Sequence, residues 1–335
     1  MLPRFAVALV LCLLVCTQSA NADAALDQLK SLYRRPTVIP FPPSAPYSPQ
    51  MATLGKMLFF DARLSGAQNM SCASCHNPSF GFEMPVPGTV GNANFKIPRQ
   101  APTLLNIAWV PILFWDGRAD SLEAQAAGPI TADVEMNGKF EEIVPRLQAV
   151  PEYKTWFERL FPGVGVSQAS VVRAIATYER TIVSGWAPFD RWIEGEENAI
   201  SEAAKRGFAL FNGSANCSKC HTSWNFTDNK FHDVGLETTD VGRAKFEPNN
   251  PKALYAFKTP GLRNTAHRAP FMHNGLTKSL EDVMVLYERG GIDRPSRSEK
   301  MQPVSLNSRQ RQDLIEFMRT LTAEKSETPL PNLPN

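Results

Sequence analysis

Cys72-Ala73-Ser74-Cys75-His76 is the stretch that decides the fold of this chain. The pattern C-x-x-C-H is the attachment signature of a c-type haem, in which two thiols bind the porphyrin and the imidazole reaches the iron. Two intervening residues place both sulfurs on one side of the macrocycle, and the His that follows can then lie under the iron. The pattern recurs at Cys217-Ser218-Lys219-Cys220-His221. We therefore predict two covalently bound haems c, with His76 and His221 as iron ligands.

Two other uses of such cysteines compete with this interpretation. C-x-x-C pairs also occur in zinc sites and in redox proteins, and four cysteines can form two disulfides. A zinc ion held by four thiols leaves the two histidines unexplained, and a disulfide framework leaves the identical spacing unexplained. Two haems account for all six residues.

The first residues are typical of a secretory signal peptide. Arg4 supplies a basic start, residues 5–16 are apolar, and Ala20-Asn21-Ala22 fits a cleavage site, so we predict a signal peptide over 1–22. Cleavage removes Cys12 and Cys16 and leaves only the cysteines of the two haem motifs. Because c-type haems are attached outside the bacterial cytoplasm, we expect a periplasmic protein.

Charge and hydropathy exclude several classes of partner. The net charge of +2 favours neither nucleic acid nor a membrane surface, and no later segment is long and apolar enough to span a membrane. A chain of 335 residues is long enough for two domains with separate cores. We place an N-terminal haem domain at 23–195 and a C-terminal haem domain at 196–335.

An internal repeat supports the two-domain organisation. Gly55-Lys56-Met57-Leu58-Phe59 precedes the first haem motif and Gly207-Phe208-Ala209-Leu210-Phe211 precedes the second. The spacing of apolar residues predicts helices over 151–161, 167–184, 280–290 and 305–321, with few strands. The Pro-rich residues 23–50 predict an extended arm over the first domain. We expect a mainly α fold of two cytochrome c-like haem domains with this N-terminal arm.

Nearly all of the mature sequence resembles the bacterial di-haem cytochrome c peroxidase and MauG superfamily. The resemblance includes both haem motifs and, in order, seven further segments: Ala101 to Asn106, Phe114 to Arg118, Gly128 to Asn137, Tyr178 to Arg180, Pro188 to Arg191, Phe231-His232 and Phe257 to Asn264. So many matches in one order make the resemblance specific.

The resemblance implies roles for three residues between the haem motifs. In this family the first haem reacts with hydrogen peroxide, and a Trp at the position of Trp115 lies between the two haems. Glu135 matches the distal carboxylate of the family and Gln125 its distal amide. A carboxyl group in an enclosed pocket can take a proton from peroxide and return it to the leaving oxygen.

The sequence departs from ordinary family peroxidases at Asn92. In those enzymes a second His binds the first haem iron in the resting state and blocks access of peroxide. That His lies within a Gly-His-Gly segment that aligns with Gly91-Asn92-Ala93. An amide is a poor iron ligand, so the resemblance and this change together predict a first iron that is open to peroxide without prior reduction.

The second departure is Tyr287, which stands where the peroxidases place the axial Met of their second haem. A phenolate is a hard anionic donor that favours ferric and higher states, whereas a thioether favours ferrous iron. Tyr at this position is typical of the MauG-like branch, in which the two haems share a high-valent state. Met284 and Met272 are the competing sixth ligands, and Met284, one turn away on the same helix, stays open.

The family also holds a calcium ion between its haems, through one amide side chain and two backbone carbonyls. These positions correspond to Gln100, Arg268 and Pro270. A Gln side chain can supply the oxygen ligand that calcium prefers, and backbone carbonyls do not depend on residue type. The resemblance therefore implies a calcium site here.

The leading functional hypothesis is a di-haem peroxidase-type oxidoreductase that uses hydrogen peroxide to oxidise an aromatic residue, Trp foremost, of an exported partner protein. Trp224 or Trp192 could carry the oxidising equivalents outwards. The alternative is a cytochrome c peroxidase that takes electrons from a small cytochrome or cupredoxin. A non-catalytic electron carrier is disfavoured by Glu135 and Gln125.

Overall fold

The structure is a computed structural model that describes residues 24–325 and 327–335. The predicted signal peptide, residues 1–22, lies outside the described residues. Within them, no helix combines the length and the apolar composition that crossing a membrane requires.

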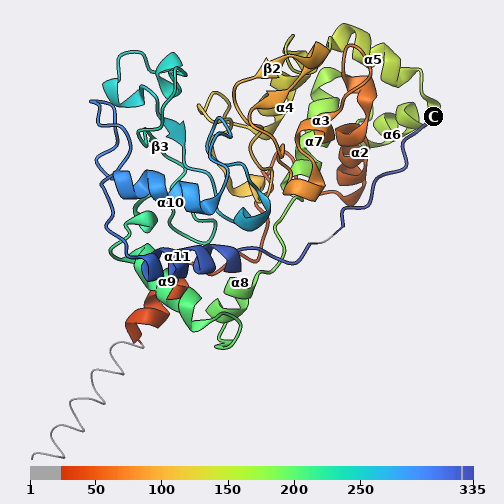
Figure 1. Cartoon of the computed structure of the whole chain (residues 1–335). Coiled ribbons are helices and arrows are strands. Elements are labelled where there is room, and N and C mark those ends of the chain that lie inside the picture. Colours follow the sequence, from red (N-terminus) through yellow and green to blue (C-terminus); the bar gives the residue numbers. More distant parts are fainter. Residues whose placement is uncertain (1–23, 326) are drawn as a thin grey trace, which may run out of the picture.

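Helices dominate the described part of the chain and form two groups (Figure 1). The first group contains α2 (Pro49–Phe60), α3 (Cys72–Cys75), α4 (Leu122–Thr131), α5 (Phe140–Gln148), α6 (Pro151–Leu160) and α7 (Gln168–Arg180). The second contains α8 (Pro188–Ile193), α9 (Glu202–Asn212), α10 (Leu280–Arg289) and α11 (Ser308–Thr320). Each group surrounds its own hydrophobic core. The predicted mainly α class is confirmed.

Short 3-10 turns and two small antiparallel β-ribbons complete the fold. The ribbons pair β1 (Thr89–Val90) with β2 (Lys96–Ile97), and β3 (Phe231–His232) with β4 (Phe257–Lys258). The turns are η1 (Ala62–Leu64), η2 (Pro78–Phe80), η3 (Asn92–Asn94), η4 (Ile107–Trp109), η5 (Cys217–Lys219), η6 (Arg243–Lys245), η7 (Pro251–Ala253) and η8 (Thr265–His267).

The repeated G-x-x-L-F segments form the same close helix contact in both groups. A Cβ atom on Gly55 of α2 would lie 1.9 Å from the carbonyl oxygen of Ala174 on α7. A Cβ atom on Gly207 of α9 would lie 2.0 Å from the carbonyl oxygen of Asp313 on α11. Only glycine permits such an approach between helix backbones. The internal repeat in the sequence therefore marks one packing motif used twice.

The predicted helices are present, with small shifts at their ends. α6 and α7 confirm the helices predicted over 151–161 and 167–184, although α7 ends at Arg180. The Ser279 side chain accepts a hydrogen bond from the Asp282 N–H at 3.0 Å and caps α10, which stops at Gly290 in the left-handed conformation (φ 73°). The last helix begins after Asn307, which caps it.

The prediction of an extended N-terminal arm over the first domain is wrong for its first third. Residues 24–31 are helical, and Tyr33 is buried in the second core, where its hydroxyl donates to Asn212 Oδ1 at 2.6 Å. Leu26, Leu29 and Tyr33 follow a helical spacing, and the prolines begin only at Pro36. The average composition of the arm concealed this short amphipathic segment.

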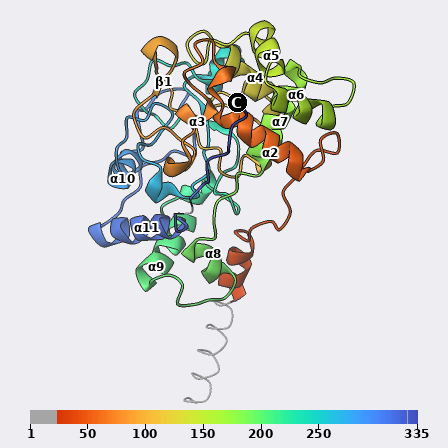
Figure 2. The ribbon, with the colours of Figure 1, turned by 90° about the vertical axis from the view of Figure 1, so that its right-hand side faces the viewer.

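Each end of the described part of the chain contacts the opposite group of helices. The N-terminal helix lies beside α8 and α9, and the chain then crosses to α2 (Figure 2). At the other end, the segment after α11 returns to the first group, where the Arg63 guanidinium donates to the Pro334 carbonyl. Side chains of α8 belong to the second core, so that core begins before the domain boundary predicted at 195/196, which stays a prediction.

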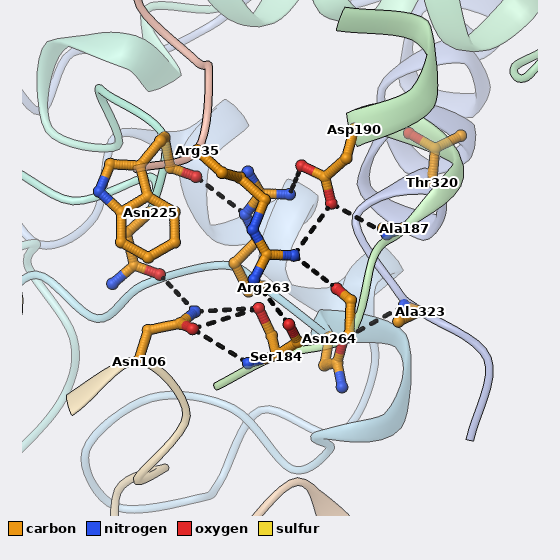
Figure 3. Close-up of polar contacts among 12 residues, drawn as sticks. Arg35, Asn106, Ser184, Ala187, Asp190, Asn225, Arg263, Asn264, Thr320 and Ala323 are labelled. Carbon is orange, nitrogen blue, oxygen red and sulfur yellow. Dashed lines mark hydrogen bonds and ion pairs between the residues drawn. The ribbon is translucent and has the colours of Figure 1, made fainter. Parts of the chain in front are cut away.

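A buried polar cluster joins the two groups at their centre (Figure 3). We call it the polar joint; its members are Arg35, Asn106, Ser184, Asp190, Asn225 and Arg263. Arg263 and Asp190 form an ion pair at 2.6 Å with side chains 2% and 1% exposed, and Arg35 approaches the same carboxylate at 3.4 Å. Asn106 donates to Asn225 Oδ1 at 3.0 Å and to Ser184 Oγ at 3.1 Å. The joint thus connects the arm, α8 and the loop after the second haem motif.

Replacement of Asp190 tests the polar joint. We expect Asp190→Ala to lower the free energy of unfolding by about 3–5 kcal/mol, because Arg263 would stay buried without a counter-charge. The measurement is guanidinium denaturation of the haem-loaded protein. As a matched control, Glu196→Ala removes an exposed ion pair with Arg191 (3.3 Å) and should cost about 0–1 kcal/mol. Equal effects of the two variants would contradict a stabilising role for the joint.

Candidate active site

The first haem motif lines a cavity in the first group of helices, here called the first cavity. Cys72 to Cys75 form the single turn α3, and the His76 N–H donates to the Cys72 carbonyl at 2.9 Å. The turn is fixed at its start by the Ser71 N–H, which donates to Ser74 Oγ at 3.0 Å. Both thiols and the imidazole line the cavity. One helical turn therefore presents the three groups that a c-type haem requires.

The second motif repeats this arrangement in the second cavity. Cys217, Cys220 and His221 line it, and the His221 N–H donates to the Cys217 carbonyl at 2.9 Å. The four cysteines of the described chain are free. Because the two pairs line different cavities, the described residues hold no four-thiol zinc site. The donor sets fit two haems c and leave the zinc and disulfide interpretations unsupported.

The proximal histidines are held in one orientation. Nδ1 of His76 lies 3.1 Å from the Phe82 carbonyl oxygen, and Nδ1 of His221 lies 2.9 Å from the Phe226 carbonyl oxygen. Burial lowers the pKa of both imidazoles, so each is neutral with its proton on Nδ1. The lone pair of Nε2 stays available for iron, and the backbone carbonyl fixes the ring.

Glu135 and Gln125 both line the first cavity, from the turn after α4 and from α4 itself. Burial raises the pKa of Glu135, and the charge of Arg118 opposes that shift. The backbone of Glu135 is fixed because its carbonyl accepts the Asn92 N–H at 2.8 Å. The structure thus brings together the acid–base group, the amide and the first haem motif.

Asn92 lies outside the lining of the first cavity. Its side-chain amide donates to the Asp133 carbonyl at 3.2 Å, and its backbone supports the Glu135 turn. The residue that aligns with an iron-closing His is therefore used here to hold the loop that carries Glu135. The open face of the first haem stays a prediction.

Trp115 lies in the wall between the two cavities and lines both of them. Its indole N–H donates to the Gln100 carbonyl at 2.8 Å, and its own carbonyl accepts the Lys258 N–H at 2.8 Å. The first bond fixes the indole ring, and the second fixes the backbone that carries it. An oxidisable aromatic ring in this place can carry electrons between the two sites.

Tyr287 lines the second cavity together with the second haem motif. Its hydroxyl has no hydrogen-bond partner among the described residues, and burial raises the pKa of the phenol. Such a phenol ionises only beside a strong positive charge, such as that of a bound metal ion. Met284 lines only a small adjoining cavity, whereas Met272 lines the second cavity. Tyr287 is thus better placed than Met284 to reach the iron.

The three residues of the predicted calcium site also lie together. Gln100, Arg268 and Pro270 line the second cavity. Gln100 Oε1 is buried without a partner among the described residues, an arrangement that a cation would relieve. The Arg268 guanidinium is paired with Glu83 at 2.7 Å, so only the backbone carbonyl of Arg268 is suited to a cation.

Profiles of two families cover most of the chain. The di-haem cytochrome c peroxidase family matches residues 49–198, and the cytochrome c family matches residues 204–322. The chain is 48% identical to "Methylamine utilization protein MauG" of Methylorubrum extorquens over 94% of this chain and 91% of that protein. The chain belongs to the di-haem cytochrome c peroxidase and MauG family. Members of this family carry two haems c and are peroxidase-type oxidoreductases.

Two further relatives show the range of the family. "Cytochrome-c peroxidase IdrP1" of a Pseudomonas species is 36% identical over 85% of this chain and 84% of that protein. A solved "MauG-like protein associated with microbial copper homeostasis" superposes with a TM-score of 0.81 at 30% identity, over 87% of this chain and 95% of that chain. Sequence and fold thus agree on the family.

Sequence reasoning missed two charged residues that line the first cavity. Glu179 is 4% exposed, has an unpaired Oε2, and has a pKa raised to about 8 by burial. Lys258 lines both cavities. Each lies in a segment that carries the family resemblance, but nothing in the sequence pattern placed it beside a haem.

The predicted exit through Trp192 is wrong, because Trp192 is 1% exposed in the second core. Trp224 is only half-buried, and its ring centroid lies 5.0 Å from that of Trp109. The Arg35 guanidinium lies 5.9 Å from the Trp224 ring and 5.5 Å from that of Trp186, which is 58% exposed. Trp186 is the surface indole that the sequence analysis overlooked.

Removal of calcium tests the Gln100 site. We expect a chelator to lower the thermal midpoint of the haem-loaded protein and added calcium to restore it, because the ion satisfies the buried Gln100 oxygen. In Gln100→Met the midpoint should no longer respond to calcium. Calorimetry with and without calcium measures both effects, and an unchanged response in the variant would exclude Gln100 as a ligand.

Proposed function

We propose that this protein uses hydrogen peroxide to oxidise an aromatic residue, Trp foremost, of an exported partner protein in the periplasm. Tyr287 in the second cavity is the observation that carries the proposal. A phenolate ligand favours the oxidised states of iron, so the second haem is suited to hold oxidising equivalents. A thioether in its place would suit electron uptake from a small redox protein.

The two haems supply the iron at which peroxide is cleaved and the capacity to hold two oxidising equivalents. The residues of the chain do the rest. Glu135 takes a proton from the bound peroxide and returns it to the leaving oxygen, while the Gln125 amide orients that oxygen. His76 and His221 are held by backbone carbonyls for iron binding. Trp115 connects the two sites through the wall that they share.

The alternative function is a cytochrome c peroxidase that consumes peroxide with electrons from a small cytochrome or cupredoxin. The relatives support both activities, but identity is higher to the MauG protein (48%) than to the cytochrome-c peroxidase (36%). The position of Asn92 outside the first cavity also favours an iron that needs no reductive opening. Both observations favour oxidation of a partner protein.

Reaction of the oxidised protein with one equivalent of peroxide tests the proposal. We expect the absorption change to persist for minutes without reductant, and Tyr287→Met to lose this persistence because a thioether disfavours oxidised iron. Met284→Leu, one turn away on α10, is the matched control and should behave as wild type. Rapid turnover with reduced cytochrome c that requires prior half-reduction would favour the alternative function.

A substitution of Glu135 tests the acid–base step. Glu135→Gln keeps the shape but cannot accept a proton, so the rate of reaction with peroxide should fall by about 10²–10⁴-fold. Because the base works ionised and its pKa is raised, the wild-type rate should fall as the pH drops through that raised pKa. Stopped-flow rates across pH measure both effects. A wild-type pH profile retained in the variant would assign the base elsewhere.

A further inference from the structure

Lys258 is built into the wall between the two haem cavities. It ends β4, where its neighbour across the ribbon is Phe231, and its backbone N–H donates to the Trp115 carbonyl at 2.8 Å. Lys258 lines the first cavity, the second cavity and a smaller third cavity. Among the cationic residues described around the two cavities, Lys258 is the one that lines both.

The ammonium of Lys258 has no protein counter-charge. No carboxylate of the described residues forms an ion pair or hydrogen bond with it, and its burial lowers its pKa to about 8. Two of the carboxylates that line a cavity together with Lys258 are paired with other residues: Glu83 pairs with Arg268 at 2.7 Å, and Asp116 pairs with Arg118 at 3.0 Å. Lys258 is half-buried, and a cation that is partly removed from water without an anion is unfavourable, so its position calls for an anionic ligand group.

Each haem brings two propionate carboxylates into its cavity. We propose that Lys258 pairs with a haem propionate and that its charge, held in the shared wall, raises the reduction potentials of both haems. A positive charge stabilises the reduced haem, which carries one positive charge fewer than the oxidised haem. Because Lys258 is half-buried, salt screens the effect less than it would at an exposed site.

The inference concerns the cofactors and holds for either candidate function. It gives Lys258 a positioning and tuning role that differs from that of Trp115, although both belong to one wall. Trp115 offers a ring through which electrons pass, whereas Lys258 sets how readily each haem accepts them. Other lysines at the cavities are differently placed: Lys300 is paired with Asp228 at 3.2 Å, and Lys245 is exposed.

Spectroelectrochemical titration of the haem-loaded protein tests the proposal. In Lys258→Met the equilibrium constant for reduction of each haem should fall at least tenfold. This corresponds to a fall of 59 mV in the reduction potential of a one-electron couple. Lys258→Arg keeps the charge and should retain both potentials. Lys245→Met, which removes an exposed charge at the first cavity only, is the matched control. It should change the equilibrium constant for reduction of either haem by less than threefold.

The outcomes separate cleanly. Unchanged potentials in Lys258→Met, or a fall at one haem alone, would overturn the shared role. If that variant fails to load haem, a crystal structure of the wild-type holoprotein decides the matter. The Lys258 Nζ within about 4 Å of a propionate oxygen supports the pairing, and a longer separation overturns it.

Discussion

The hydrogen bond from the Lys258 N–H to the Trp115 carbonyl, 2.8 Å long, is the contact on which the two-site arrangement depends. It fastens a loop of the first half of the chain to the β-ribbon of the second. Through it, one wall separates the cavities and presents an indole to both. The Gln100 carbonyl accepts the N–H of the same indole, and Gln100 Oε1, which has no partner among the described residues, belongs to a residue that lines the second cavity. Backbone hydrogen bonds therefore connect the indole, Lys258 and the expected calcium ligand Gln100 within one wall.

Such a wall is useful only if the two helix groups cannot move apart. The polar joint opposes such movement, and so do the contacts that each end of the described chain makes with the opposite group of helices. Arg263 is anchored by Asp190 and donates to the Trp224 carbonyl at 2.8 Å, three residues after His221. Arg263 thus anchors the loop behind the second haem motif to α8, and the hydrogen bond from Asn106 to Asn225 connects that loop to the first half of the chain. A junction that resists movement would keep the separation between the two haem sites constant, and electron transfer depends steeply on that separation.

Features that are local in the sequence could be predicted well. The haem motifs are five residues long, helical spacing revealed α6, α7 and α10, and the Asn92 substitution was visible at one position. The arm was predicted wrongly because a composition average hid the helical spacing before Pro36. Trp186, Glu179 and Lys258 could not be assigned because the residues that they face, Arg35, Cys72 and Trp115, lie more than 100 positions away in the sequence. Contacts of that range follow from packing and not from any local pattern.

The charges around the two haems suggest where oxidising equivalents come to rest. A Tyr287 phenolate would add negative charge at the second cavity alone, whereas the Lys258 ammonium acts on both. The ammonium raises both reduction potentials, so it has little effect on the difference between them. The phenolate would lower the reduction potential of the second haem alone. The second haem should therefore be the easier one to oxidise, and oxidising equivalents generated beside Glu135 should move towards it through Trp115. That direction leads to the half of the molecule where Trp224 and the exposed Trp186 approach the surface. Under the proposed function, Tyr287 would therefore favour oxidising equivalents at the second haem, on the side where these two indoles lie.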